Sequence, residues 1–508
     1  MTVTDQAREN VMREVHEIVR DLELGAGADE IITAVQRLPA REARWAPMPR
    51  WIHPDLLAAY SAKGIEQLYI HQAEAVERVH KGENIVVVTP TASGKTLCYN
   101  LPVLDSILKN SDTRALYLYP TKALAQDQLA ELQDLARRAG DRIGIFTYDG
   151  DTPADARPSI RHYGHIVLTN PDMLHTGILP HHTKWTRLLE NLQYVVIDEL
   201  HVYRGVFGSN LANVLRRLKR ITRFYGRNPQ FIFSSATIAN PGELAERMIE
   251  QEVSVVDSNG APSAEKIFIF YNPPLVDRFL GIRRSYINEA WRIVRRFLKH
   301  GLQTIVFANS RLHTEVLLTY LKRDNPRPPG SPDIIRGYRG GYLPLERREI
   351  EHGLRNGQIK AVVATNALEL GIDIGSLDAV VMAGYPGTIA STWQRAGRAG
   401  RRKGLSYAVL VASSRPLDQF IVKHPEYFFA GSPEHAYIQP DNLEILVNHL
   451  KCAAFELPIE PGESFGRIDL KLLCESLAQA GYLHRSGELW YWSEETYPAD
   501  TISLRSVS

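Results

Sequence analysis

The chain alternates short, continuously apolar segments with longer amphipathic segments, and this alternation restricts its fold more than any other feature. One series of apolar segments lies between residues 85 and 237, and a second lies between residues 303 and 413. Segments that are apolar at every position are typical of parallel strands buried on both faces, with amphipathic helices covering them. A linker rich in Gly and Pro, residues 259–275, separates the two series. The sequence therefore predicts two consecutive α/β sheets.

The strand rhythm stops beyond about residue 430. The stretch PDNLEILVNHLKCAAFELPI has the pattern of a buried helix, and DLKLLCESLAQAGYLHRSGELWYW has that of a helix followed by a hairpin with a Ser-Gly turn. These elements predict a small winged-helix-like domain. The expected domains are an N-terminal helical extension (1–50), a first lobe (51–270), a second lobe (271–430) and this last domain (431–508), which we expect to be incomplete.

Bulk composition excludes several classes of protein. The 508 residues carry a formal net charge of +1, so a nucleic-acid partner would have to be bound by a locally basic groove. The three cysteines, Cys98, Cys452 and Cys474, form no Cys-x-x-Cys pair, which argues against a zinc site and a disulfide framework. No apolar run has the length of a membrane span, and the N-terminus lacks the pattern of a signal peptide.

The stretch VVVTPTASGKTLCYNLPVL, residues 86–104, joins a strand pattern to a helix pattern through a turn of small residues and one Lys. Such a turn can present backbone N–H groups and a helix N-terminus to a phosphate. Gly94, Lys95 and Thr96 stand where a phosphate loop approaches the β- and γ-phosphates and Mg²⁺, but Thr89 replaces the first glycine of that pattern. On these residues alone, an ordinary strand-turn-helix remains an alternative.

Two acidic residues close a second apolar strand, in the stretch YVVIDELH. Asp198 can hold Mg²⁺ through its water shell, and Glu199 can orient or deprotonate an attacking water. Taken by itself, an acidic pair at a strand end can equally be a helix cap or a solvated loop.

The stretch TWQRAGRAGRR places Arg395, Arg398 and Arg401 three residues apart, with glycines between them. A permanently charged guanidinium stabilises a γ-phosphate during transfer. If these arginines act on the nucleotide bound near residue 95, the two sheets must face each other across it. The alternative is a basic surface helix.

Nine stretches, in order along the chain, resemble the motifs of superfamily 2 helicases. The resemblance rests on their order as well as on their letters, and it spans residues 67–401. Within it, Thr89 and Ala92 depart from the commonest form of the phosphate loop. The stretches are LYIHQ, TPTASGKT, PTKALAQDQ, LTNPDML, DELH, SAT, IVFANSR, TNALELGID and QRAGRAGR.

Further stretches are similar to the mitomycin repair factor A family, bacterial DNA repair helicases related to the fungal Hrq-type, RecQ4-like enzymes. They are TYDGDT, DELHVYRGVFGSNLANVLRRLKR, YRGGYLPLERREIE and NHLKCAAFELP, and the similarity runs from about residue 40 to the end. It implies an α/β fold with two tandem RecA-like lobes and a winged-helix-like domain. It also implies an ATP- and Mg²⁺-dependent 3′→5′ DNA helicase or translocase that acts in excision repair of mitomycin-type lesions.

The same resemblance implies partners and location. The expected partners are single-stranded and partly duplex DNA, with other repair proteins as candidates and no membrane. The expected location is the cytoplasm, in association with the nucleoid. That family continues into a C-terminal module with a four-cysteine zinc site, so we expect this chain to be C-terminally truncated and assign it no zinc ligand.

The motif positions imply individual roles. The residues expected to act in catalysis are Lys95, Glu199, Arg398 and Arg401. Those expected to hold the nucleotide are Gln72 (on adenine), Thr91, Ala92, Ser93, Gly94, Lys95, Thr96, Asp198, Gly371, Asp373, Arg398 and Arg401, with Thr96 and Asp198 toward Mg²⁺. Those expected to couple the two lobes are Ser235, Thr237 and Gln394.

A further set is expected to contact nucleic acid, because its members sit at strand ends where family members touch the backbone. For the small hydroxyls and amides, plain turn formation is the alternative. Tyr338 beside Arg339 could stack on a base, or it could belong to the core. The set is Pro120, Thr121, Lys122, Thr169, Asn170, Arg311, Tyr338, Arg339, Gly340, Thr365 and Asn366.

Readings from other classes stay open on the residues alone. An RNA helicase shares the core motifs, and no residue here visibly reads a 2′-hydroxyl. An ATP-gated DNA clamp would bind DNA without unwinding it. A phosphate-loop transporter or kinase is more distant, because it has no need of a second sheet carrying three arginines.

Overall fold

The computed structural model describes residues 31–328, 330–339, 342–369, 374–375, 377–400, 405–431 and 433–506. These residues form two compact units, and each is described by itself. The phosphate-loop unit comprises Arg44–Thr89, Ser93–Gly260 and His435–Ser508. The arginine unit comprises the described residues within 31–43, Pro90–Ala92 and Ala261–Glu434.

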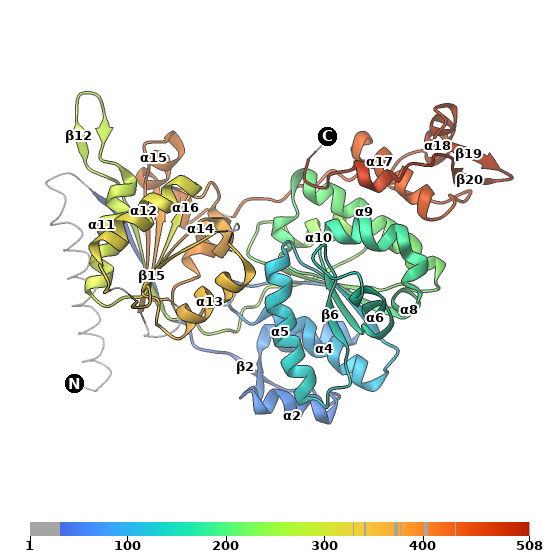
Figure 1. Cartoon of the computed structure of the whole chain (residues 1–508), viewed down its shortest axis with the longest axis horizontal. Coiled ribbons are helices and arrows are strands. Elements are labelled where there is room, and N and C mark those ends of the chain that lie inside the picture. The colour runs from blue at the N-terminus through green and yellow to red at the C-terminus, as the bar shows by residue number, and fades with distance from the viewer. Residues whose placement is uncertain are drawn as a thin grey trace. The chain divides into compact units, whose positions relative to one another are not determined.

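A sheet of seven parallel strands forms the centre of the phosphate-loop unit (Figure 1). Every neighbouring pair runs parallel. In sheet order the strands are β10 (Ser254–Val256), β4 (Ile85–Val88), β9 (Gln230–Ser235), β8 (Leu192–Ile197), β5 (Arg114–Leu118), β7 (Ile166–Thr169) and β6 (Ile145–Thr147).

Helices cover both faces of this sheet, which explains why its strands are apolar at every position. Along β4, Val86 and Val88 pack into one core cluster, while Ile85 and Val87 pack into the other. The helices that contribute to the first cluster include α9 (Gly205–Phe224), α10 (Pro241–Ile249), α6 (Ala156–Tyr163) and α8 (Thr186–Leu189). Those that contribute to the second are α2 (Pro54–Ala62), α3 (Ile70–His80), α4 (Lys95–Lys109) and α5 (Lys122–Arg138).

A second seven-stranded sheet forms the centre of the arginine unit. Its order is β1 (Ile32–Leu38), β11 (Glu265–Tyr271), β18 (Leu405–Val411), β17 (Ala379–Ala383), β14 (Thr304–Ala308), β16 (Ala361–Ala364) and β15 (Ile335–Tyr338). All neighbours are parallel except β1, which is antiparallel to β11. Its principal helices are α11 (Tyr286–Lys299), α12 (Arg311–Asp324), α13 (Pro344–Arg355), α14 (Ile389–Ala396), α15 (Pro416–Lys423) and α16 (Pro425–Phe429).

The expectation of a helical extension over residues 1–50 is wrong for its described part. Residues 32–38 form strand β1, and residues 45–47 form strand β2 (Trp45–Pro47), which pairs with β3 (Gln67–Tyr69). The β-branched residues Ile32, Thr33 and Val35 suit a strand, and β1 covers the edge that β11 would otherwise leave unpaired. Strand β11 also places residues 265–270 in the second sheet rather than in the first lobe.

The C-terminal residues form the predicted helix, helix and hairpin. The elements are α17 (Leu443–Glu456), α18 (Leu470–Gln479), β19 (Leu483–Ser486) and β20 (Leu489–Trp492). Gly487 in the hairpin turn has φ +62°, which the predicted Ser-Gly turn requires. No described helix is both long and apolar enough to cross a membrane.

A fully buried ion pair joins this C-terminal domain to the phosphate-loop sheet. Arg217 on α9 donates Nε to both carboxylate oxygens of Glu456 on α17, at 3.1 Å each. The guanidinium also contacts Nδ1 of His175 at 2.6 Å and Nδ1 of His449 at 3.2 Å. Both histidines therefore accept from Arg217, and burial lowers the pKa of His175 to about 3.

Candidate nucleotide and nucleic-acid sites

The loop between β4 and α4 has the shape of a phosphate cradle. Its backbone turns through left-handed conformations at Ala92 (φ +68°) and Gly94 (φ +80°), and α4 begins directly after it. A turn of this kind and a helix N-terminus together present N–H groups to an anion. Lys95 follows immediately, and its Nζ donates to the Thr89 carbonyl at 2.8 Å.

The structure explains the threonine that replaces the first glycine of the loop pattern. Thr89 is fully buried, and its Oγ1 lies 2.6 Å from Oγ of Ser93. This hydroxyl pair closes the base of the loop from within. Thr91 and Thr96 are half-buried at its rim, while Ala92 is exposed. A threonine in place of the first glycine is therefore compatible with the conformation of the phosphate loop.

Gln72, at the start of α3, is hydrogen-bonded to the phosphate loop. Gln72 accepts from the Tyr69 amide at 2.9 Å and donates to the Gly94 carbonyl at 2.9 Å. The φ of +80° at position 94 favours glycine, and a Cβ there would also lie 2.5 Å from the Gln72 amide nitrogen. Gln72 thus positions the loop, and its expected contact with adenine stays a prediction.

His71 is a positioning residue that the sequence did not reveal. Its Nδ1 accepts from the Gly260 amide at 3.2 Å, and its Nε2 lies 3.1 Å from the Ser93 carbonyl. The proton therefore resides on Nε2, which donates to Ser93. Burial, with Lys95 acting in the same direction, lowers the pKa of His71 to about 4. The available signal was its place beside Gln72 in LYIHQ.

The acidic pair follows β8, at the same sheet edge as the phosphate loop. β9 separates β8 from β4, which puts the two strand ends about 10 Å apart. Asp198 is buried and accepts a hydrogen bond from the Ser234 hydroxyl. Burial and then the Glu199 carboxylate raise the pKa of Asp198 to about 7, while Lys95 acts in the opposite direction.

Glu199 adopts a left-handed backbone conformation, φ +54° and ψ +47°. A non-glycine residue in this region stores strain, which is typical of functional sites. Its Oε2 lies 3.5 Å from Nδ1 of His201, and that nitrogen accepts from the Ala236 amide at 3.1 Å. Because Nδ1 accepts from Ala236, it has no proton for Glu199, so His201 is bonded to the SAT loop and lies beside the Glu199 carboxylate. In that loop, Ser235 is buried and donates to the Ala236 carbonyl at 2.7 Å, while Thr237 is exposed.

This donor set fits a nucleotide-bound Mg²⁺. Magnesium commonly keeps several waters and takes one or two protein oxygens together with substrate phosphates. Asp198 and the Thr96 hydroxyl are suitable oxygens on neighbouring parts of one edge. Among the described residues, no group of three or more His, Cys, Asp or Glu side chains could hold a metal ion by itself.

In the arginine unit, Glu369 organises the arginine run. Arg395 donates Nε to the Glu369 carboxylate at 2.8 Å and lies over the Phe307 ring, 5.1 Å from its centroid. Arg398 is buried and donates to the Glu369 carbonyl at 2.9 Å. Gln394 is buried on α14. Gly371, Asp373 and Arg401 lie outside the described residues.

Trp393, which precedes the arginine run, packs within the arginine unit. Its ring stacks on Phe428 at 5.2 Å and meets the edge of Phe268 at 5.4 Å.

Two expected nucleic-acid contacts are wrong as side-chain contacts. Tyr338 is buried and donates its hydroxyl to Glu351 at 2.7 Å, so it belongs to the core and offers no ring to a base. Thr169 is buried and donates to the Tyr148 carbonyl at 2.6 Å. In both cases the polar atom closes a local hydrogen bond, which was the alternative left open by the sequence.

Other residues of that set lie at loops on the strand-end edges. Thr121 and Asn170 cap helices by accepting from the amides of Leu124 (3.3 Å) and Met173 (2.9 Å). Lys122 is exposed and lies 2.9 Å from Asp151. Pro120 is buried, Arg339 and Thr365 are half-buried, and Arg311 and Asn366 are exposed, while Gly340 lies outside the described residues.

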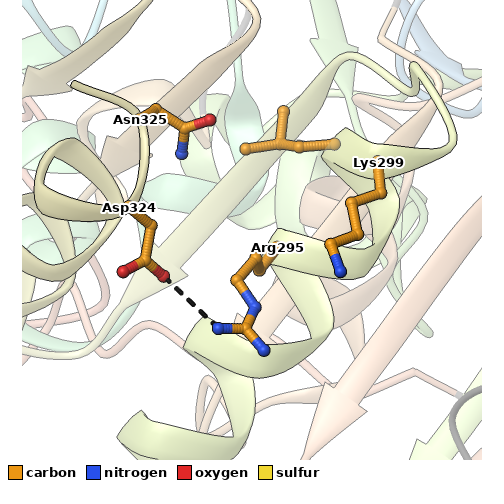
Figure 2. Close-up of a pocket in the computed structure, with 5 residues that line it drawn as sticks. Arg295, Lys299, Asp324 and Asn325 are labelled. Atoms are coloured by element: carbon orange, nitrogen blue, oxygen red, sulfur yellow. Dashed lines mark ion pairs between the residues drawn. The ribbon is translucent and has the colours of Figure 1, made fainter.

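A cavity of about 460 Å³ lies elsewhere, at the C-terminal ends of α11 and α12 (Figure 2). It is lined by Arg295, Leu298, Lys299, Asp324 and Asn325, and Arg295 lies 3.8 Å from Asp324. Both helices run back from the strand-end edge, so this cavity is at the opposite edge from the motif loops. Its cations face a carboxylate and two helix C-termini, which accounts for their presence.

The loops and sheets together define the two-sheet core of a superfamily 2 helicase, and comparison with known proteins agrees. Family models match for DEAD/DEAH box helicases (residues 69–244), for the helicase conserved C-terminal domain (289–403) and for the winged helix domain of ATP-dependent helicase HRQ1 (438–507).

Individual relatives show which helicases within this superfamily the chain is similar to. The uncharacterized ATP-dependent helicase YprA of Bacillus subtilis (strain 168) is 56% identical over 97% of this chain and 65% of its own length. ATP-dependent helicase HRQ1 of Saccharomyces cerevisiae is 36% identical over 99% of this chain and 48% of its own length. A crystal structure of DUF1998 helicase MrfA bound to DNA and AMPPNP is 56% identical, with a TM-score of 0.91 over 96% of this chain and 68% of that one.

The chain therefore belongs to the superfamily 2 helicases of the MrfA and Hrq1 type, which confirms the expected family and fold class. It spans about two thirds of YprA and about half of HRQ1.

Proposed function

We propose that this protein is an ATP-dependent DNA helicase or translocase that moves 3′→5′ and acts in excision repair of mitomycin-type lesions. The observation that carries the proposal is the convergence of Lys95, Thr96, Asp198 and Glu199 at one edge of the phosphate-loop sheet. Its support from relatives is that several are named ATP-dependent helicases and that MrfA has been solved with DNA and an ATP analogue.

Each residue has a proposed role in ATP hydrolysis. Lys95 neutralises the β- and γ-phosphates, Thr96 and Asp198 hold Mg²⁺, and Glu199 orients the attacking water. Arg398 and Arg401 stabilise the charge that develops on the γ-phosphate. ATP supplies the phosphoryl group, and the protein supplies position and charge.

Nucleic acid is proposed to bind along the strand-end loops, through Lys122, Arg311, Arg339 and the exposed Asn366, and through backbone amides near Thr121 and Asn170. Contacts of this kind go to phosphates, so binding should be insensitive to sequence and sensitive to salt.

Two experiments test the proposal. Steady-state ATPase is measured without polynucleotide and with single-stranded DNA, duplex DNA or RNA; we expect single-stranded DNA to stimulate it most. Strand displacement is then measured on two partial duplexes with opposite overhangs. Faster unwinding from the 5′ overhang would refute the polarity, DNA binding without displacement would indicate a clamp, and stimulation by RNA alone would indicate an RNA helicase.

A further inference from the structure

A short hairpin in the arginine unit exposes an unusual amount of apolar surface. Strands β12 (Leu275–Asp277) and β13 (Ile282–Arg283) pair antiparallel and project from the sheet (Figure 1). Phe279 at the tip is 96% exposed. Val276, Leu280 and Ile282 are more than half exposed as well. Because water disfavours such a cluster, an exposed patch of this kind marks an interaction site.

The tip is a built turn. The Asp277 carboxylate accepts from the amides of Phe279 at 2.8 Å and of Leu280 at 2.9 Å. Gly281 closes the turn with φ +67°. At the base, the Arg284 amide donates to the Pro274 carbonyl at 2.9 Å. These bonds hold Phe279 outward on a defined ribbon.

Topology puts the hairpin at the edge that carries the helicase motif loops. It follows Tyr271 at the C-terminal end of β11, and β11 runs parallel to β14 and β16, whose ends lead to Arg311 and Thr365. Three strand spacings separate β11 from β14, or roughly 14 Å along the edge. DNA that follows this edge would therefore reach the hairpin.

The charges and shapes of the hairpin fit DNA. Within the hairpin, Arg278, Arg283 and Arg284 outnumber the one acid, Asp277, whose carboxylate accepts from the turn amides. Arg283 also donates to the Pro273 carbonyl at 2.7 Å, and Arg284 lies 4.0 Å from Glu289 at the base of the hairpin. Arginines suit phosphates, and Phe, Leu and Ile are the side chains that proteins insert between base steps to unstack them. A planar ring can also stack on any base, without regard to sequence.

We propose that the β12–β13 hairpin contacts DNA where the strands separate, with Phe279 stacked on the terminal base pair. This inference rests on the proposed DNA helicase function and adds a residue outside the helicase motifs. The hairpin would disfavour re-pairing behind the junction, so it acts on unwinding and leaves ATP hydrolysis on single-stranded DNA unaffected.

The test uses the 508-residue chain with Phe279→Ala, Phe279→Trp and a control, Leu345→Ala. Leu345 is 78% exposed on α13 of the same unit. A partial duplex carries 2-aminopurine at its first paired position, and unwinding and single-strand-stimulated ATPase are measured in parallel. We expect Phe279→Ala to lower the unwinding rate about tenfold, the factor given by one lost base–aromatic stack, with ATPase within about twofold of wild type.

Phe279→Trp should retain unwinding and the change in 2-aminopurine fluorescence on binding, and Leu345→Ala should match the wild type. An active wild type with Phe279→Ala unwinding at the same rate would overturn the inference, and so would an unchanged fluorescence signal in that variant. A monomer–dimer change in Phe279→Ala during gel filtration without DNA would assign the tip to a second copy instead. Absence of DNA binding by the wild type would refute the proposed function itself.

Discussion

His71 makes two hydrogen bonds whose effects can be separated by mutation. One goes to the phosphate loop, and the other goes to the chain segment that leads to the arginine unit. Its Nε2 donates to Ser93 in the loop, and its Nδ1 accepts from Gly260. Asparagine places its polar atom near the position of Nδ1, and glutamine places one near Nε2. His71→Asn should therefore keep the Gly260 bond and lose the Ser93 bond, while His71→Gln should do the reverse.

The size of the effect follows from burial. His71 is fully buried, and leaving a buried acceptor or donor without a partner costs about 1–3 kcal/mol. In His71→Asn the unsatisfied group is the Ser93 carbonyl, within the phosphate loop. If about 1 kcal/mol of that cost falls on the nucleotide-binding form of the loop, the KM for ATP rises about fivefold. His71→Gln should leave this KM close to that of wild type.

The assay is single-strand-stimulated ATPase with ATP varied, together with equilibrium binding of a fluorescent ATP analogue. A KM that rises in His71→Asn and stays unchanged in His71→Gln supports the assignment of the two nitrogens. Equal rises in both variants would show that the residue acts through packing alone. No rise in either would show that the Ser93 bond does not order the loop.

The pH dependence of stability gives a second measure. The pKa of His71 is lowered from 6.5 to about 4 in the folded protein, so the folded state favours the neutral ring. Its contribution is complete above pH 6.5 and is lost as the pH falls toward 4; between pH 8 and pH 5 the loss is about 2 kcal/mol. Urea unfolding should therefore show a larger drop in midpoint over this range for wild type than for His71→Gln.

Three further predictions concern other residues. Glu199→Gln should bind ATP with unchanged affinity and lose about 100-fold or more in turnover, whereas Lys95→Ala should lose both ATP affinity and turnover. ATP binding and steady-state ATPase measure the two quantities. Retention of a tenth of the turnover by Glu199→Gln would exclude the proposed role of Glu199 on the attacking water. Arg217→Met should lower the free energy of unfolding by about 3–5 kcal/mol, because it leaves the Glu456 carboxylate buried and unpaired. The double variant Arg217→Met/Glu456→Leu should recover much of the urea midpoint. Failure of that recovery would mean that the ion pair is not the source of the loss. Ala92→Gly should raise the thermal midpoint or leave it unchanged, because it relieves a left-handed alanine; a clear drop would mean that the alanine side chain makes a needed contact.

The sequence predicted what depends on local pattern. Strands buried on both faces have no polar positions, so β4 and β8 were recognisable, and the loops that follow them carry the residues expected for ATP. Strand β1 was missed because its partner, β11, lies more than 200 residues away and its own pattern has no clear alternation. Pairing between distant segments leaves little trace in either one.

The site predictions failed where a polar side chain has a hydrogen-bond partner inside the protein, on another element. Tyr338 and Thr169 stand at strand ends, where a hydroxyl can face either the solvent or the core, and the letters do not distinguish these cases. The partners of these hydroxyls, Glu351 and the Tyr148 carbonyl, come from other elements. His71 was missed for the same reason, because its importance lies in contacts with Ser93 and Gly260, 22 and 189 residues away.

The buried pair between Arg217 and Glu456 bears on how the C-terminal domain takes part in the cycle. Helix α9 begins at Gly205, shortly after Glu199, and carries Arg217 to the contact with α17. Separating the two helices would break this pair and the bonds from Arg220 to the Ala453 and Pro458 carbonyls. Each of these groups that stayed buried without a partner would cost about 1–3 kcal/mol. Asn210 and Asn213 on α9 add hydrogen bonds to Leu504 and Pro440 of the same C-terminal region. The winged-helix elements should therefore move as one body with the loops that carry Lys95 and Glu199 throughout turnover.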